Sequence, residues 1–232
     1  MSLLSVLLIS GCSKKSEEGE MTINIDKDFE YVSKGHPLGL SVGQTQAVGL
    51  KPSPYETLQK EPVYGADEVV YGYIPLGNSG DTKISFAIDS SEDGKAVAYV
   101  DTNNNEDLTD DGPPHPNQGT GKFAALISLN VEVISASGKK IMRPYQFWFW
   151  IDASDSPRFY TRCHYRGQVS IGAEEYLAIA CESKNHDALY KESGLWIDLN
   201  ENGKLDDSQE HFSDGATISV GGAQRVLHLS YP

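Results

Sequence analysis

Apolar residues from position 68 onward either alternate with polar residues or form short runs, and clusters of Gly, Asn, Asp and Ser separate these segments. Alternation with a period of two is typical of strands that bury one face, and short apolar runs are typical of strands buried on both faces. The pattern contains no convincing amphipathic helix. It therefore predicts an all-β protein, with strands over residues 69–74, 82–88, 96–100, 123–134, 145–151, 159–164, 176–181, 195–197, 217–220 and 225–229.

The order of these elements repeats along the chain. Residues 96–105 correspond to residues 193–202, with a hairpin before each copy and a further strand pair after it. Two copies are too few for a solenoid, so we expect two tandem β-rich repeats packed as a sandwich or as a pair of small barrels. The expected organisation is a signal and tether (1–20), an irregular N-terminal extension (21–67), a first repeat (68–152) and a second repeat (153–232).

The net charge of the chain limits the kinds of partner that it can bind. The 232 residues contain 19 Lys and Arg against 33 Asp and Glu, a net charge of −14. Such a surface repels phosphate backbones, so the sequence predicts no nucleic-acid partner. Hydrophobic residues make up 39% of the chain, which is enough for a globular core and excludes wholesale disorder.

Each repeat carries an acidic loop directly after its central strand: loop one (residues 101–111) and loop two (residues 198–210). Both loops place oxygen-bearing side chains at positions 1, 3 and 5, and together they hold most of the net negative charge. Crowded like charges destabilise a loop that has no counter-ion. Ca²⁺ takes about six to eight oxygen ligands and tolerates an irregular arrangement better than Mg²⁺ does. Because His and Cys are missing from both loops, we expect calcium rather than zinc or copper.

These loops resemble the EF-hand-type calcium loop, in the helix-free form of dockerin-like and other extracellular bacterial modules. The resemblance implies side-chain ligands at positions 1, 3 and 5 and a backbone carbonyl at position 7. Neither loop has the bidentate Glu of position 12, so another acid must close each shell. The implied ligands are Asp101, Asn103, Asn105, the carbonyl of Asp107, and Asp110 or Asp111 in loop one; and Asp198, Asn200, Asn202, the carbonyl of Lys204, and Asp207 or Glu210 in loop two.

The Gly that the calcium loop requires at position 6 distinguishes the two copies. Loop two has Gly203 there, whereas loop one has Glu106, so we expect loop two to be the stronger site. Asn in place of Asp at two positions favours weak binding, with a Kd on the order of 10⁻⁴ to 10⁻³ M, as in extracellular modules. The sequence thus predicts two Ca²⁺ ions with a structural role.

The N-terminal residues indicate where in the cell the protein is located. A short apolar stretch over residues 3–9 leads into Ser10-Gly11-Cys12, and a polar, charged run follows. This segment resembles the lipobox of bacterial lipoproteins, in which small residues precede a Cys that is diacylated. The resemblance implies export, a lipid on Cys12 that inserts into the membrane, and a location in the bacterial cell envelope.

Export makes a disulfide between Cys163 and Cys181 one interpretation. If the strands on either side of Ile171-Gly172-Ala173 form a hairpin with a three-residue turn, the two cysteines lie opposite each other within bonding reach. The alternative is two buried free thiols, because a register slip of one residue would separate them.

The strand over residues 145–151 is the most aromatic in the chain. One face carries Tyr145, Phe147 and Phe149, and the other carries Trp148 and Trp150. One face must be core. The face with the two Trp residues is then either the contact between the repeats or a platform on which sugar rings stack.

No catalytic residue emerges. Gly39-Leu40-Ser41-Val42-Gly43 matches the pattern of a nucleophile elbow, but the surrounding prolines and the β-rich pattern do not supply the strand–turn–helix that the mechanism needs. We therefore expect a binding or structural module with a carbohydrate or protein ligand. The alternative is an extracellular hydrolase or other carbohydrate-active enzyme that uses the loop carboxylates as acid and base.

Overall fold

The computed structural model describes residues 17–35, 46–66, 68–90, 96–152, 154–182, 185–206 and 208–230. Across these ranges the regular structure is almost entirely β, with one short helix, and the strands form four sheets. No sheet within these ranges closes into a barrel. The all-β prediction is confirmed, and the sheets pack as sandwiches, with a separate sandwich in each half of the chain rather than one formed between the repeats.

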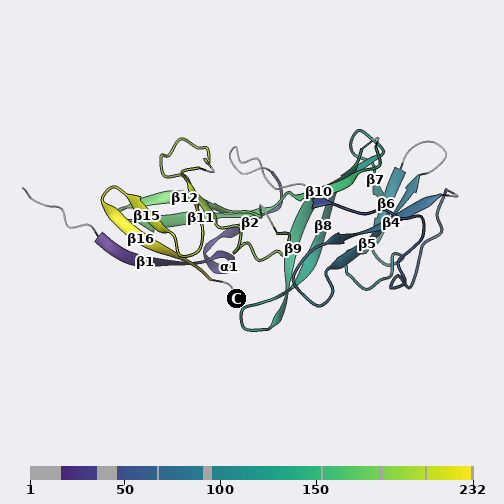
Figure 1. The fold of residues 1–232 in the computed structure, drawn as a ribbon, viewed down its shortest axis with the longest axis horizontal. Coiled ribbons are helices and arrows are strands. Elements are labelled where there is room, and N and C mark those ends of the chain that lie inside the picture. The colour runs from purple at the N-terminus through teal and green to yellow at the C-terminus, as the bar shows by residue number, and fades with distance from the viewer. Residues whose placement is uncertain are drawn as a thin grey trace, which may run out of the picture.

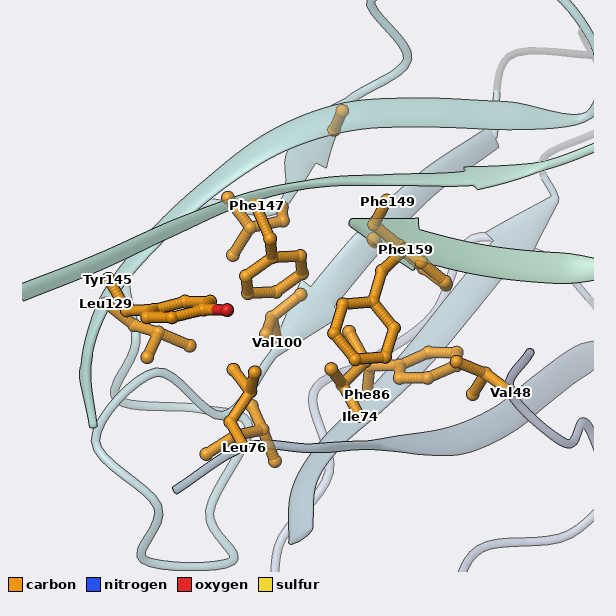
Figure 2. Close-up of a cluster of buried hydrophobic side chains, with 14 of the residues drawn as sticks. Val48, Ile74, Leu76, Phe86, Val100, Leu129, Tyr145, Phe147, Phe149 and Phe159 are labelled. Carbon is orange, nitrogen blue, oxygen red and sulfur yellow. The ribbon is translucent and has the colours of Figure 1, made fainter. Parts of the chain in front are cut away.

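Residues 46–161 form the first sandwich, at the right of Figure 1, from two antiparallel sheets. Alternation along the strands turns Phe86 and Phe149 toward each other, with ring centroids 4.8 Å apart, and Figure 2 shows them in the core with Phe159. One sheet contains β4 (Val69–Pro75), β5 (Lys83–Ser90), β6 (Ala96–Val100) and β7 (His115–Pro116); the other contains β3 (Gln46–Ala47), β10 (Pro157–Thr161), β9 (Lys140–Ile151) and β8 (Phe123–Ile134).

The second sandwich, at the left of Figure 1, has its own hydrophobic cluster. Helix α1 (Ile25–Asp28) lies beside it and buries Ile25 completely. One sheet contains β14 (His211–Phe212), β13 (Leu195–Ile197), β12 (Glu174–Ala180), β11 (His164–Ile171) and β2 (Glu30–Val32); the other contains β1 (Glu17–Asn24), β16 (Ala223–Ser230) and β15 (Thr217–Val220).

The two sandwiches repeat one order of elements. Strands β4-β5-β6-β7 lie side by side in that order, as do β11-β12-β13-β14, and a hairpin follows each set: the long β8–β9 hairpin in one and the shorter β15–β16 hairpin in the other. Each acidic loop joins the third strand of its set to the fourth. The prediction of two tandem β-rich repeats is therefore confirmed.

The division between the halves differs from the one expected at 152/153. Strand β10 pairs with β9, opposing Phe159 to Phe149, so the first sandwich extends to Thr161. Strand β1 begins inside the expected tether (1–20) and continues into the extension expected to be irregular, and it pairs with β16. Strand β2 lies within that extension and pairs with β11 of the second sandwich. An unpaired sheet edge exposes backbone donors and acceptors, and these N-terminal strands cover two such edges.

Residues 48–66 of the same extension first pair beside β4, at the edge of the β4–β7 sheet, and then cross the outer face of that sheet. Lys51 forms a β-bridge with Tyr71, and the backbone N–H of Gly65 donates to Asp89 Oδ2 at 2.7 Å. The apolar side chains beneath this segment form a small cluster around Tyr71 and Leu108. The segment therefore gives this sheet a second buried face, although its own sequence is Pro-rich and irregular.

Cys163 and Cys181 are free and buried, which corrects the interpretation that they form a disulfide. Strands β11 and β12 pair Ile171 with Glu174 around a two-residue turn, Gly172-Ala173, rather than a three-residue one. The register is thus shifted by one residue from the expected one. Such a shift turns side chains to opposite faces of the sheet, and Cys163 and Cys181 accordingly lie in different hydrophobic clusters.

Gly72 on β4 permits close packing of the first core. A Cβ atom at this position would lie 2.3 Å from Phe86 Cζ and 2.8 Å from the carbonyl oxygen of Gly49. We expect Gly72→Ala to lower the free energy of unfolding by about 1–3 kcal/mol, since overpacking forces the ring and backbone apart. Gly80→Ala is the matched control, because a Cβ there has no neighbour within 4 Å. Equal urea midpoints for the two variants would contradict the prediction.

Candidate metal centre

The two acidic loops share one backbone conformation. Positions 4 and 6 have positive φ in both: 57° at Asn104 and 63° at Glu106 in loop one, 55° at Glu201 and 73° at Gly203 in loop two. The left-handed region is costly for a Glu side chain and easy for Gly. Loop one keeps this shape despite its unfavourable residue, so the conformation is imposed by the contacts around it.

The first Asp of each loop is buried and folds back over the turn. Asp101 is fully buried and Asp198 is 5% exposed. In both loops the two carboxylate oxygens accept hydrogen bonds from the backbone N–H groups at positions 5 and 6, so each carboxylate points into its loop. The distances are 3.0 Å (Asn105 N–Asp101 Oδ1), 2.7 Å (Glu106 N–Asp101 Oδ2), 3.1 Å (Asn202 N–Asp198 Oδ1) and 3.0 Å (Gly203 N–Asp198 Oδ2).

A second acid closes each loop from its far end. Asp111 Oδ1 accepts from the backbone N–H of Asn103 at 3.3 Å, and Glu210 Oε1 accepts from the equivalent N–H of Asn200, also at 3.3 Å. The longer Glu side chain begins two residues further along its loop and reaches the same place. Of the alternatives that the sequence left open, Asp111 and Glu210 therefore occupy equivalent positions.

Asp110 lies between the two Asn side chains of loop one. Its carboxylate accepts from Asn103 Nδ2 at 3.1 Å and from Asn105 Nδ2 at 2.9 Å. Turning the two amides over exchanges each nitrogen for an oxygen of nearly the same size. Oxygens about 3 Å apart match neighbouring ligands around Ca²⁺ at 2.3–2.6 Å. Asp207, the corresponding alternative in loop two, lies outside the described residues.

Loop one contains buried oxygens that its own hydrogen bonds do not satisfy. Asp111 Oδ2 and Asn104 Oδ1 have no hydrogen-bond donor in the described part of the chain. Burial raises the pKa of Asp101, two backbone hydrogen bonds oppose this, and the nearby charges of Asp111 and Glu106 raise it further. A cation would relieve the repulsion and coordinate the unsatisfied oxygens. Loop one therefore fits a hard cation.

Asp107 turns its side chain out of loop one. Lys60 Nζ lies 2.5 Å from Asp107 Oδ2, and this contact, with hydrogen bonds from Thr109, lowers the pKa of Asp107 to about 2. The Asp107 carbonyl is then the group available to an ion, as the calcium-loop resemblance implies. Sequence reasoning missed Lys60, because its position depends on the path of residues 48–66 over the sheet.

In loop two, more of the side-chain oxygens accept hydrogen bonds from within the loop than in loop one. Asn200 Oδ1 accepts from Asn202 N at 3.0 Å, Asn202 Oδ1 accepts from Lys204 N at 2.8 Å, and Glu210 Oε2 accepts from Asp206 N at 3.0 Å. Within the described residues of this loop, every buried side-chain oxygen has a partner. The sequence favoured loop two because of its Gly at position 6, whereas these contacts indicate that loop one has the greater need for a cation.

The donors in both loops are carboxylate, amide and carbonyl oxygens. Over the described ranges, no three His, Cys, Asp or Glu side chains converge on one point. A shell built here therefore depends on amide and backbone oxygens as well as acids, a mixture that Ca²⁺ accepts. The chemistry of the donors fits Ca²⁺ better than a metal that prefers imidazole or thiolate.

Trp148 and Trp150 lie half-buried on the outer face of the β8–β9 sheet, opposite the core face. They belong to none of the hydrophobic clusters of the described residues, and Trp150 meets Tyr160 edge to face with ring centroids 5.5 Å apart. A sugar-stacking role for this face stays a prediction. Cys12 and Ser41 lie outside the described residues.

Comparisons with protein-family models, with curated proteins and with solved structures find no match for this chain. Among the helices of the described residues, none is long and apolar enough to cross a membrane. The functional interpretation therefore rests on the geometry of the two loops.

Proposed function

We propose that this protein is an exported, lipid-anchored, calcium-binding β protein that acts as a binding or structural module. The observation that carries the proposal is the hydrogen-bond pattern that the two loops share. In each loop the first Asp is buried and accepts hydrogen bonds from the backbone N–H groups at positions 5 and 6. A second acid accepts a hydrogen bond from the backbone N–H at position 3. A plain turn has no need to place a second acid beside a buried Asp, whereas an ion site does.

An ion in loop one would also stiffen the segment around Gln59 and Lys60, which is hydrogen-bonded to the loop. The Glu106 carbonyl accepts from Gln59 N at 2.8 Å and from Lys60 N at 3.3 Å, and Leu108 N donates to the Lys60 carbonyl at 3.1 Å. The loop thereby holds part of the segment that covers the outer face of the β4–β7 sheet. At tenfold excess over Kd, calcium would stabilise the fold by about 1.4 kcal/mol per site.

Calorimetric titration with Ca²⁺ and thermal melts with and without chelator test the proposal. We expect two ions per wild-type chain, one in Asp101→Asn, one in Asp198→Asn and none in the double variant, with Kd values on the order of 10⁻⁴ to 10⁻³ M. Chelator is expected to lower the wild-type melting temperature and to leave the double variant unchanged.

Asp152→Asn is the matched control for these substitutions. Asp152 also accepts hydrogen bonds within a turn, from Ser154 and Ser156, and its replacement removes the same charge outside both loops. This variant is expected to bind two ions. If millimolar Ca²⁺ produces no heat of binding and chelator leaves the wild-type midpoint in place, the loops are solvated turns.

The hydrolase alternative calls for two carboxylates that face each other across an open cleft, about 5 to 9.5 Å apart. Asp101, Asp111, Asp198 and Glu210 instead accept backbone hydrogen bonds inside their own loops. This arrangement favours binding over acid–base chemistry.

The anchoring part of the proposal depends on Cys12. We expect Cys12→Ser to release the protein from the membrane fraction of a bacterial host and to abolish incorporation of labelled fatty acid. Recovery of the variant in the membrane fraction would count against a lipid anchor without affecting the calcium proposal.

A further inference from the structure

Strand β8 lies at the edge of its sheet, because the order of the described strands there is β3-β10-β9-β8. It is twelve residues long and pairs with β9 along its whole length (Figure 1). A strand at a sheet edge presents backbone donors and acceptors with which another strand can pair, and proteins usually cover or blunt such edges. The outer edge of β8 is therefore a surface on which a further strand can pair.

The even-numbered residues of β8 turn their backbone groups away from β9. The Ala124 N–H donates to Asn117 Oδ1 at 3.0 Å, and the Ala124 carbonyl oxygen accepts from Gln118 N at 2.7 Å, so both groups point outward. In an antiparallel strand the N–H and the carbonyl of one residue point to the same side, and the side alternates along the strand. The outer edge therefore consists of the backbone groups of residues 124, 126, 128, 130, 132 and 134.

Amide side chains cap both ends of this edge. At one end, Gln118 Oε1 accepts from Leu126 N at 3.3 Å. At the other end, Asn78 Oδ1 accepts from Ile134 N at 2.7 Å, and Asn78 Nδ2 donates to the Ile134 carbonyl oxygen at 3.2 Å. An amide that accepts and donates in this way takes the place of a neighbouring strand. The caps thus mark where pairing along β8 stops.

Between the caps the edge is open. Gly77 covers the Glu132 carbonyl oxygen, since a Cβ on Gly77 would lie 2.7 Å from that atom. Within the described residues, no hydrogen bond involves the backbone carbonyl of Leu126, either backbone group of Ser128 and Asn130, or the N–H of Glu132. Ser128 and Asn130 are exposed and uncharged. Charged side chains are a usual protection of open edges, and the middle of this edge has none.

The open stretch is complementary to itself. Antiparallel pairing about a twofold axis at Leu129 places Ser128 of one copy opposite Asn130 of the other, and the reverse on the far side of the axis. Every open backbone group of these two residues then has a partner, and the caps of both copies lie outside the paired residues. No like charges face each other, and Ser and Asn side chains can form hydrogen bonds across the strands.

We propose that the protein forms a symmetric dimer in which the β8 strands of two copies pair antiparallel through Ser128 and Asn130. The two four-stranded sheets then form one continuous sheet across the interface. The match about Leu129 favours a second copy over an unrelated extended segment, which needs no twofold match. The paired stretch is short, so we expect a weak interface of less than about 1,200 Å². The proposal is independent of calcium binding, since no paired residue belongs to either acidic loop.

Sedimentation velocity of the purified full chain, from micromolar to millimolar concentration, tests the proposal. We expect a reversible monomer–dimer equilibrium. Ser128→Pro removes an outward N–H and leaves the β8–β9 ladder intact, so it is expected to weaken dimerisation at least about tenfold. Ser128→Ala is the matched control, because it keeps this N–H, and it is expected to dimerise as wild type. A wild-type chain that stays monomeric at millimolar concentration would overturn the proposal.

A disulfide trap tests the register without a proline. Ser128→Cys combined with Asn130→Cys sets the new thiols opposite each other across the axis, so mild oxidation is expected to link two chains. Thr217→Cys combined with Ser219→Cys is the matched control: both positions are exposed, with the same spacing, on β15 at the edge of another sheet. Equal yields of linked dimer from the two double variants, or a dimer that persists in a folded Ser128→Pro variant, would contradict pairing through β8.

Discussion

Replacing Arg143 with alanine is expected to lower the free energy of unfolding by about 3 kcal/mol, because the substitution removes a buried guanidinium from a partly buried ion pair and leaves a buried carbonyl oxygen without its donor. Arg143 lies on β9 and is 3% exposed. Its guanidinium donates to Asp26 Oδ2 in α1 and, at 2.6 Å, to the carbonyl oxygen of Ala188. A strand of the first sandwich is thereby tied to α1, which lies beside the second sandwich, and to the segment that follows β12.

The same strand offers a matched control. Lys140 on β9 pairs with Glu132 at 2.9 Å, but the Lys140 side chain is 68% exposed and the Glu132 side chain is 32% exposed. An exposed pair contributes about 0–1 kcal/mol, so Lys140→Ala is expected to leave the urea midpoint nearly in place. Asp26→Ala combined with Arg143→Ala should cost much less than the sum of the two single changes. Equal effects of Arg143→Ala and Lys140→Ala would show that the junction contributes little to stability.

Local pattern was sufficient to predict most of the strands from residue 69 onward and the places of the two loops. Alternation along residues 145–151 placed Phe147 and Phe149 in the core, and the second occurrence of the Asp101 segment at Asp198 located both loops between equivalent strands. Period-two alternation and turn chemistry depend on residues that are near in sequence, so they can be recognised without knowledge of the fold.

Long-range contacts could not be predicted in this way. The parallel pairing of Ile23 with Leu229 joins the two ends of the described chain, and no local signal marks it. The register of the β11–β12 hairpin differed from the expected one by one residue, because a two-residue turn follows Ile171. This difference places Cys163 and Cys181 apart, and both are free thiols. In loop one, Lys60 reaches Asp107 only because an irregular segment crosses the sheet. Side chains that meet across such distances depend on the whole fold.

Replacing Glu182 with glutamine is expected to stabilise the protein at pH 7, although it removes a charged residue from a hydrogen-bonded network. Glu182 is fully buried, and its carboxyl group contacts the Tyr145 hydroxyl and accepts from Ala188 N at 2.5 Å. The Tyr145 hydroxyl also lies 3.0 Å from His186 Nδ1. Burial raises the pKa of Glu182 well above 4.5; the hydrogen bonds from Tyr145 and Ala188 oppose this rise, and the nearby Asp187 adds to it. The folded state therefore favours the neutral carboxyl group.

The sign of the pH effect follows from this direction. Well below pH 4.5 the Glu182 carboxyl group is protonated in both the folded and the unfolded chain, so this group adds no pH dependence to the stability there. As the pH rises above that value the unfolded chain loses the proton first, and stability falls until the folded pKa is passed. Each unit of pH across this window costs about 1.4 kcal/mol. Glutamine does not titrate, and its amide can accept from Ala188 and donate to Tyr145, so Glu182→Gln avoids this loss.

Urea unfolding of wild type and Glu182→Gln between pH 4 and pH 8 measures the effect. We expect similar midpoints near pH 4 and an advantage of the variant that grows toward neutral pH. Glu182→Ala is the control for the network itself, because it leaves the buried Ala188 N–H without its acceptor and the Tyr145 hydroxyl with His186 alone, and it is expected to be less stable than wild type by about 1–3 kcal/mol. A Glu182→Gln variant that loses stability at pH 7 would instead mean an ionised Glu182 paired with a protonated His186, whose Nδ1 lies 3.9 Å from Glu182 Oε2. The junction between the sandwiches would then be held by a buried charge pair rather than by neutral hydrogen bonds.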